Sequence, residues 1–277
     1  MNITDLPIMR RYIRMCGDGW LQGWHERNGG NLTYRLTAEE AAQMKPFFDA
    51  QPRPWVAMGV TGKNLAGEYF ISTGSGKYFR NVALDPADSL CVVEINEAGD
   101  SYRIVWGLSD GTAPTSELPS HILIHAVRAE ATDYHSRILY HAHPSNVVAL
   151  TMVLPGCART ITRALWGAMT ECIMLVPQGL GFVEWKMPGS ADIAQATAEC
   201  MREYPAVVWA HHGLFTSGSS FQDVFGMAHT IDKAAGIYLS ARAANGGSDE
   251  FASTISNENL LQICDELSLD CKREWLE

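Results

Sequence analysis

Two histidines stand one residue apart in the stretch I-L-Y-H-A-H-P-S-N, residues 138–146. Residues i and i+2 of a β-strand project from the same face, so His141 and His143 would point in one direction. The residues before them favour a strand, and Pro144 ends its hydrogen-bond ladder. The spacing therefore aims two imidazoles at one point, which is enough to begin a metal site but not to complete it.

A second pair, His211 and His212, closes the run V-V-W-A-H-H, residues 207–212. Its β-branched and aromatic residues predict a strand over 206–212. Adjacent strand residues face opposite ways, so only one of the two histidines is expected to reach the same metal, and periodicity does not choose between them. Two histidines from one strand and one from another make the three-nitrogen set of catalytic zinc, which leaves a position open for substrate.

His121 and His125 have the i, i+4 spacing on a predicted helix, 116–131, and this spacing can also chelate a metal. However, the stretch lacks the glutamate of an H-E-x-x-H motif, and His125 lies among apolar residues. A packed or capping pair is therefore the favoured interpretation.

Two glycine-containing segments could hold an anion. R-N-G-G-N, residues 27–31, frees the backbone to turn its amides toward a ligand, although a helix end followed by a turn explains it equally well. S-T-G-S-G-K, residues 72–77, matches neither the Walker A nor the dinucleotide-binding spacing. With Ser75 and Lys77 it could still hold a single phosphate.

The stretch A-P-T-S-E-L-P, residues 113–119, places Ser116 and Glu117 at the start of the predicted helix 116–131. Ser116 can cap this helix, and a helix N-terminus favours the negative charge of Glu117. Beside a three-histidine zinc, a carboxylate held in this way becomes a candidate general base.

The elements that would position these residues alternate along the chain, which predicts an α/β protein. Strands 90–96 and 101–107 flank the turn E-A-G-D, so part of the sheet is expected to be antiparallel. The other predicted strands are 31–36, 68–73, 137–143, 171–176, 181–185 and 206–212. The predicted helices are 5–24, 116–131, 145–154, 190–203, 220–244 and 256–268.

Composition narrows the class of protein. The 277 residues contain no evident linker or repeat, which favours one domain over 1–277. A formal charge of −10 without a basic cluster argues against a nucleic-acid partner. Seven cysteines without a C-x-x-C pair, and no signal-peptide pattern, favour a reducing cytoplasm. No apolar run approaches the ~20 residues that span a bilayer, so no membrane partner is expected.

The H-A-H at 141–143, the H-G at 212–213, N-G-G-N, T-G-S-G-K and T-S-E-L-P together resemble the class II aldolase/adducin family of sugar-phosphate lyases. The resemblance covers most of the chain. It implies a three-layer α/β/α sandwich with a mostly antiparallel central sheet, assembled as a homotetramer.

The resemblance also implies roles for individual residues. One zinc per chain would be bound by His141, His143 and His212, because the family's ligand directly precedes the glycine, and Glu117 would be the catalytic acid/base. Glu171 matches a carboxylate contributed across a subunit interface. Positions that hold the phosphate and neighbouring oxygens match Asn28, Gly30, Asn31, Ser75, Gly76 and Ser116.

The implied reaction is the reversible cleavage of a ketose 1-phosphate, foremost L-rhamnulose 1-phosphate, to dihydroxyacetone phosphate and L-lactaldehyde in L-rhamnose catabolism. L-Fuculose 1-phosphate, a pentulose 5-phosphate or an epimerase reaction remain alternatives within the family. A class I aldolase would instead form a Schiff base through a lysine such as Lys77. Adducin-like binding without catalysis is the alternative from another class, and the complete histidine set with Glu117 argues against it.

Overall fold

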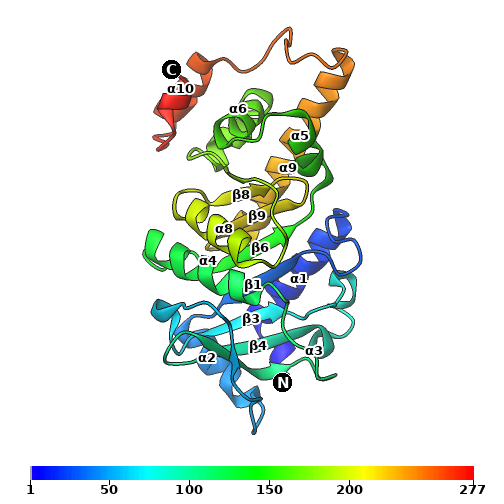
Figure 1. Cartoon of the computed structure of the whole chain (residues 1–277), viewed down its shortest axis with the longest axis vertical. Helices are drawn as coiled ribbons and strands as arrows, with labels where there is room; N and C mark the ends of the chain where they lie inside the picture. The colour runs from blue at the N-terminus through cyan, green and yellow to red at the C-terminus, as the bar shows by residue number, and fades with distance from the viewer. Residues whose placement is uncertain (1) are drawn as a thin grey trace.

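The computed structural model describes residues 2–277. Nine strands form one sheet in the order β2-β5-β4-β3-β1-β6-β9-β8-β7 (Figure 1). Seven neighbouring pairs are antiparallel and β7–β8 is parallel, which confirms the mostly antiparallel sheet. The strands are β1 Asn31–Arg35, β2 Val56–Ala57, β3 Tyr69–Thr73, β4 Leu90–Ile95, β5 Ser101–Gly107, β6 Ile138–Ala142, β7 Gly181–Val183, β8 Ala206–Trp209 and β9 Gly213–Gly218.

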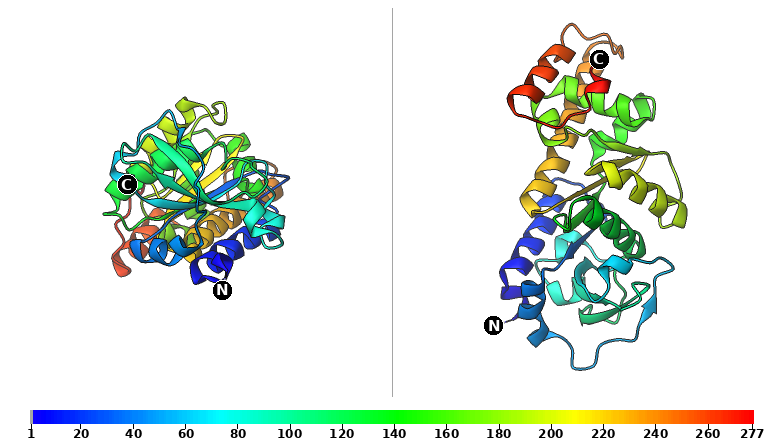
Figure 2. Two further views of the ribbon diagram at one scale, coloured as in Figure 1. Left: turned by 90° about the horizontal axis from the view of Figure 1, so that it is seen from below. Right: turned by 90° about the vertical axis from the view of Figure 1, so that its left-hand side faces the viewer.

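Helices cover both faces of this sheet, giving the expected α/β/α layers. Along β6, Ile138 and Tyr140 pack into the core shared with α1 and α9, whereas Leu139 packs into a core shared with α4 and α8. Figure 2 shows α1, dark blue, and α9, gold to orange, on one side of the sheet. The helices are α1 Pro7–Leu21, α2 Ala38–Met44, α3 Pro86–Ser89, α4 Leu118–Ala131, α5 Ser145–Val153, α6 Ala158–Ala168, α7 Thr170–Leu175, α8 Ala191–Glu203, α9 Phe221–Ala244 and α10 Asn257–Glu266.

Serine caps define three of the predicted helix starts. Ser190, Ser220 and Ser256 each accept a hydrogen bond from the backbone amide three residues later, so α8, α9 and α10 begin one residue after the predicted positions. The predicted hairpin is also confirmed, because β4 and β5 are antiparallel neighbours. No helix within residues 2–277 is long and apolar enough to cross a membrane.

The predicted strand 171–176 is wrong, because this segment forms α7. Its buried residues are Cys172, Ile173 and Val176, whereas Met174 and Leu175 are exposed. That spacing follows a helical period, but a segment of six residues is too short for its periodicity to distinguish a helix from a strand.

Three other expectations need correction. The strand predicted over 206–212 ends at Trp209, and after a turn the chain returns as β9, which was not predicted. The helix predicted from 116 begins at Leu118, with Glu117 in the N-cap position, so Ser116 does not cap it. Helices α2 and α6 were also not predicted, although Thr37 and Glu40 form a capping box at the start of α2.

Candidate metal centre and its carboxylates

Three central strands bring the predicted site residues to one edge of the sheet. β1 is paired on one side with β3 and on the other with β6, in a register that places Asn31 opposite His141. β6 is paired in turn with β9, and Ala142 lies opposite Leu214. Because these neighbours are antiparallel, the start of β1 and of β9 meets the end of β3 and of β6.

The three histidines of the expected metal site converge at this edge. His141 Nε2 lies 3.2 Å from His212 Nε2 and 3.3 Å from His143 Nε2. A metal ion that binds two nitrogens at ~2.0–2.1 Å with tetrahedral geometry holds them roughly 3.3–3.4 Å apart. The spacing and chemistry of this donor set therefore fit a zinc-sized cation.

The second ring nitrogen of two of these histidines is held by the protein. His141 Nδ1 lies 3.2 Å from the Leu214 carbonyl oxygen, and His143 Nδ1 lies 2.6 Å from Glu26 Oε1. An Nδ1–H that donates to such an acceptor leaves the lone pair on Nε2, where a metal needs it. Burial lowers the pKa of His141 well below its usual value and that of His212 to about 4, so both rings are neutral near pH 7.

His211 does not join this cluster. It is exposed, it has a left-handed backbone with φ of 58°, and its amide donates to Thr151 Oγ1 at 3.0 Å. Both histidines lie in the turn between β8 and β9, so the alternation of a strand does not decide their directions. A Cβ on Gly213 would lie 2.3 Å from the Ala142 carbonyl oxygen, so only glycine lets β9 approach β6 closely beside His212.

Glu117 lies in the N-cap position of α4, where only 9 % of its surface is exposed. Asn31 Nδ2 donates a hydrogen bond of 2.8 Å to Glu117 Oε2. Burial raises the pKa of Glu117, while the hydrogen bond from Asn31 and the nearby His143 oppose this rise. A carboxyl group with a raised pKa can exchange a proton with a reacting atom near neutral pH.

The two glycine segments lie beside these groups. Gly30 has φ of +73°, and a Cβ there would lie 2.6 Å from the His141 carbonyl oxygen. Ser75 donates its amide to the Ala113 carbonyl, and Thr115 donates its amide to the Thr73 carbonyl. These bonds align the segment that carries Ser75 and Gly76 with the segment that carries Ser116. Ser75, Gly76, Ser116 and Asn28 all have solvent-accessible surface.

Lys77 is already paired within its own loop. Its Nζ lies 2.9 Å from Asp88 Oδ2 and 2.6 Å from Asp110 Oδ2. Slight burial lowers the pKa of Lys77, but the bonds to Asp110 and Asp88 outweigh it and leave the pKa raised. A Schiff-base lysine needs a lowered pKa, so this environment argues against the class I alternative.

Glu171 is not gathered at the sheet edge with the other predicted residues. It is exposed in the first turn of α7, a helix that packs against α6, α9 and α10. Within residues 2–277 it makes no hydrogen bond with the histidines of the cluster or with Glu117.

Two neighbours of the site were missed by the sequence reasoning. Glu26 immediately precedes the glycine segment and bonds His143. His25 stacks on Phe79 with ring centres 3.6 Å apart, and its nitrogens reach the Gly29 carbonyl oxygen and the Tyr140 hydroxyl. Because Tyr140 precedes His141, His25 links the glycine segment to β6, which carries His141 and ends just before His143.

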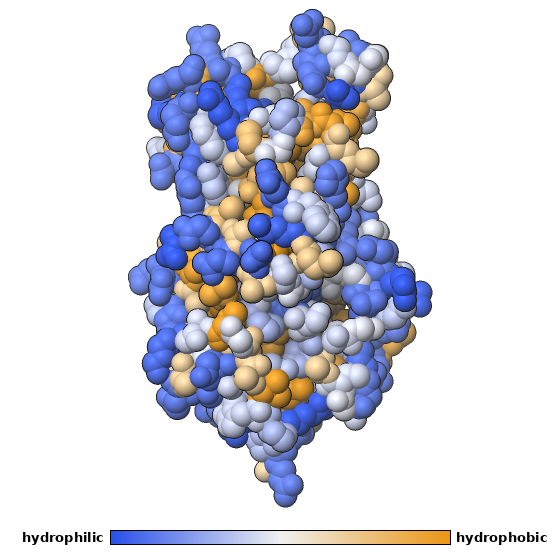
Figure 3. Space-filling view, in the orientation of Figure 1, coloured by the Kyte–Doolittle hydropathy of each residue, from blue (hydrophilic) through white to orange (hydrophobic). Residues whose placement is uncertain are grey.

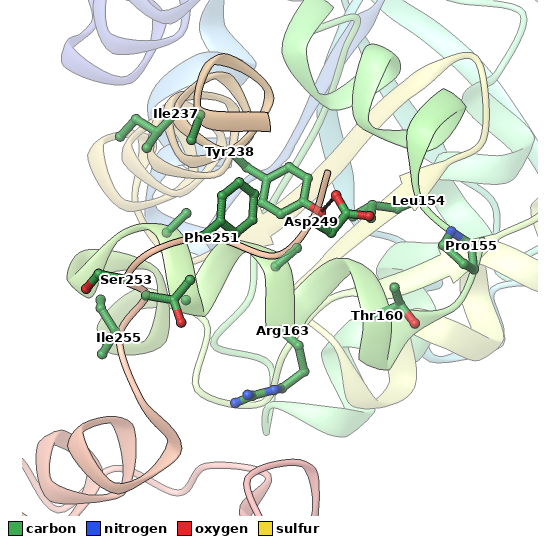
Figure 4. A pocket seen from close by; sticks show the side chains of 15 residues that line it. Leu154, Pro155, Thr160, Arg163, Ile237, Tyr238, Asp249, Phe251, Ser253 and Ile255 are labelled. Carbon is green, nitrogen blue, oxygen red and sulfur yellow. Dashed lines mark hydrogen bonds between the residues drawn. The ribbon is translucent and has the colours of Figure 1, made fainter. Parts of the chain in front are cut away.

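A large cavity lies elsewhere in the molecule. It has a volume of about 490 Å³ and is bounded by α6, the end of α9 and the segment after it, with Tyr238, Phe251 and Arg163 in its wall (Figure 4). None of the predicted site residues lines this cavity. The chemistry of the sheet edge therefore does not depend on it.

Comparisons with known proteins show to which family the chain belongs. Residues 10–239 match the model of the class II aldolase and adducin N-terminal domain. The chain is 42% identical to proteins named rhamnulose-1-phosphate aldolase from Escherichia coli O139:H28 and from Salmonella heidelberg, over 95% of this chain and 94% of each relative.

Solved structures share the fold. A sugar-phosphate aldolase from Thermotoga maritima superimposes with a TM-score of 0.70 at 24% identity, covering 87% of this chain and 96% of that one. An L-fuculose-1-phosphate aldolase from Thermus thermophilus gives 0.57 at 18% identity, covering 87% and 97%. The matched family model spans most of the chain and includes every histidine of the cluster. The chain therefore belongs to the class II aldolase and adducin family.

Proposed function

We propose that this protein is a zinc-dependent aldolase that reversibly cleaves L-rhamnulose 1-phosphate to dihydroxyacetone phosphate and L-lactaldehyde. The observation that carries the proposal is the convergence of three histidine Nε2 atoms at the sheet edge that also holds the buried Glu117. The relatives named for this substrate, at 42% identity over nearly their whole length, support the choice of sugar phosphate.

His141, His143 and His212 would hold one zinc per chain. When bound, zinc would supply a Lewis acid that polarises the oxygens on C2 and C3 of the ketose. Neutral imidazoles add no negative charge, so the ligand set preserves the full charge of the cation. Glu26 and the Leu214 carbonyl fix the ring orientation of His143 and His141.

Glu117 would exchange the proton at C3. Cleavage removes the proton of the C4 hydroxyl, breaks the C3–C4 bond and leaves the electron pair on C3, delocalised onto the C2 oxygen. Release of dihydroxyacetone phosphate then requires a proton on C3, which Glu117 supplies. In the direction of synthesis, ionised Glu117 removes the same proton. Asn31, through its bond to Oε2, orients the carboxylate for both directions.

The phosphate would be held by the two glycine segments, which carry Asn28, Gly30, Asn31, Ser75 and Gly76, together with Ser116. Their amides and short polar side chains contribute orientation more than charge, because Lys77 is committed to two aspartates. Fixing a non-reacting phosphate places C3 beside Glu117, and such positioning lowers the barrier substantially.

Glu171 would act in a neighbouring chain of a homotetramer, as the family resemblance implies. Its exposure on α7 and the exposed apolar neighbours Met174 and Leu175 support a contact with another chain. We also propose that the reaction serves the breakdown of L-rhamnose, in keeping with the names of the bacterial relatives. The seven free cysteines favour the cytoplasm as its location.

The decisive experiment assays purified protein on L-rhamnulose 1-phosphate with and without a chelator. Activity should vanish with chelator and return with zinc. Glu117→Gln should keep its zinc and fold but lose ~10²–10⁴-fold in kcat, because an amide cannot exchange the proton. L-Fuculose 1-phosphate is the comparison substrate, and product analysis separates cleavage from epimerisation. Zinc-independent cleavage, or near-normal turnover by Glu117→Gln, would refute the proposed chemistry.

A further inference from the structure

A buried line of polar contacts joins the central strand β1 to helix α4. Asn31 donates to Glu117, and Thr33 Oγ1 lies 2.7 Å from His121 Nδ1 and 2.8 Å from His125 Nε2. Strand residues two apart share a face, and so do helix residues four apart. Asn31 and Thr33 therefore meet successive turns of α4, and we call these five residues the β1–α4 ladder.

The β1–α4 ladder is costly to bury. Its five side chains are at most 9 % exposed. Within residues 2–277, three of its polar atoms are buried and have no hydrogen-bond partner: Asn31 Oδ1, His121 Nε2 and His125 Nδ1. A buried polar atom without a partner has lost its hydration without gaining a hydrogen bond, which destabilises the folded state. The surroundings are apolar, with Phe70 beside His125 and Phe215 beside His121. Apolar residues of similar size would pack here without that cost.

What the ladder gains is a fixed position for the helix. The hydroxyl of Thr33 has one proton, so it donates to one imidazole and accepts an N–H from the other. The contacts of Thr33 with His121 and His125, and of Asn31 with Glu117, constrain the rotation of α4 and its position along β1. If the helix shifted by one residue, these hydrogen bonds would be lost. Glu117 lies one turn before His121, and its carbonyl accepts the His121 amide at 2.9 Å.

We propose that the β1–α4 ladder positions the Glu117 carboxylate, and that Thr33, His121 and His125 are positioning residues for proton transfer. The inference rests on the proposed function, in which Glu117 exchanges a proton with C3 of the substrate. The ladder costs some stability but fixes the helix register. This explains why Thr33, His121 and His125 are buried polar residues although the proposed function gives them no contact with metal or substrate.

The test compares Thr33→Val, which keeps the shape but removes the hydroxyl, with Thr33→Ser, which keeps the hydroxyl. Displacing a catalytic group by ~1 Å can cost ~10²-fold, so Thr33→Val should lower kcat by at least about tenfold. KM and zinc content should stay close to those of the original protein, because the phosphate segments and the histidine cluster are unchanged. Thr33→Ser should restore most of kcat.

A second variant separates positioning from stability. Thr33→Val combined with His121→Leu and His125→Leu removes the hydroxyl and both imidazoles together. None of these three positions then has a buried polar side-chain atom without a partner. Its melting temperature should equal or exceed that of Thr33→Val, while its kcat stays low. If Thr33→Val alone does not fold, the kcat of this triple variant provides the test instead.

The outcomes distinguish this inference from the proposed function. If Glu117→Gln is inactive but the folded Thr33→Val or triple variant retains full kcat, the ladder is packing alone and the inference is wrong. If Glu117→Gln itself remains active, the proposed catalytic role of Glu117 is wrong, and the inference that rests on it is wrong as well. Equal losses of kcat in Thr33→Val and Thr33→Ser would also overturn the inference, since the hydroxyl would then be irrelevant.

Discussion

At the scale of single residues, the site depends on which nitrogen of each histidine is free. A backbone carbonyl fixes His141, whereas a carboxylate, Glu26, fixes His143. A charged acceptor makes the imidazole a stronger donor of electrons to a metal than a neutral carbonyl does. Glu26 should therefore contribute to metal affinity although it touches no substrate in the proposed mechanism.

We expect Glu26→Gln to weaken zinc binding by roughly 10–100-fold, since the partner of His143 loses its charge. Competition with a fluorescent chelator measures the dissociation constant. The matched control is Glu39→Gln, because Glu39 is also exposed and, within residues 2–277, its only side-chain hydrogen bond is with Gln43. Unfolding of the metal-free protein should be unaffected by either change. If the dissociation constant of Glu26→Gln is unaltered, the Glu26–His143 bond does not contribute to zinc affinity.

The choice between His211 and His212 gives a second prediction. His143→Ala or His212→Ala should abolish zinc binding, because two nitrogens remain where three converge. His211→Ala should retain about one zinc per chain, since His211 is exposed and lies outside the cluster. Metal analysis of the dialysed variants decides this. A zinc-free His211→Ala with a zinc-loaded His212→Ala would reverse the assignment.

At the scale of elements, the sequence predicted those parts of the site that lie within one regular segment. The strand period predicted His141 and His143 on one face. β6 confirms the strand as far as Ala142, and His143, directly after it, still converges with His141. His212 could not be selected by period, because a turn with a left-handed residue lies before it. The contacts of Glu26 with His143 and of Thr33 with α4 join residues about a hundred positions apart. No local pattern records such a register.

The same reasoning explains which elements were missed. The segment at α7 was too short to show its period. β9 was missed because the strand predicted before it, 206–212, included the turn that separates β8 from β9. The single-domain expectation for 1–277 stays a prediction, although all nine strands belong to one sheet.

The turn between β8 and β9 offers an element-scale prediction. Gly213→Ala would set a Cβ 2.3 Å from the Ala142 carbonyl oxygen, so β9 must move away from β6 and carry His212 with it. Zinc affinity should fall by about tenfold or more, and the melting temperature should fall. Gly226→Ala is the control, since that site inside α9 has open space and should be stabilised slightly. Unchanged zinc affinity in Gly213→Ala would show that the close approach of β9 to β6 does not determine the position of His212 in the metal site.

At the scale of the whole molecule, the proposed assembly would need a surface that a second chain can cover. The face in Figure 3 carries apolar, orange patches among its polar side chains. The exposed large apolar residues include Met152, Met174, Leu175, Trp185 and Met187. Two of them share α7 with Glu171, so a chain that covers α7 would also cover Glu171, as the proposed role of Glu171 across a subunit interface requires.

We therefore expect Glu117→Gln and Glu171→Ala chains to complement one another. Each variant alone should be weakly active, because every site lacks one carboxylate. After the two are mixed, dissociated and reassembled, some sites combine an intact Glu117 with the neighbour's intact Glu171, and activity should rise severalfold above either parent. If reassembled tetramers, confirmed by light scattering, show no gain, Glu171 does not act across an interface.

Acid stability is a property of the whole fold because buried histidines must stay neutral. Burial lowers the pKa of His25 to about 4, of His121 to about 3 and of His125 well below its usual 6.5. Below pH 6.5 the unfolded chain binds protons at these three sites and the folded chain does not. The unfolded state is then favoured, so stability is complete above the unfolded pKa and is lost as pH falls toward the folded values.

Each such histidine contributes up to ~1.4 kcal/mol per pH unit, so the free energy of unfolding of the metal-free protein should fall by at least about 3 kcal/mol between pH 6 and pH 5. Denaturant unfolding curves at several pH values measure this slope. His125→Phe should reduce the fall by about 1 kcal/mol, whereas His135→Gln, at an exposed histidine, should leave it unchanged. A flat slope, or a slope that His125→Phe does not change, would mean that these histidines are protonated in the folded protein. The β1–α4 ladder with neutral imidazoles would then be excluded. A protonated His125 beside Thr33 would be a buried charge without a partner.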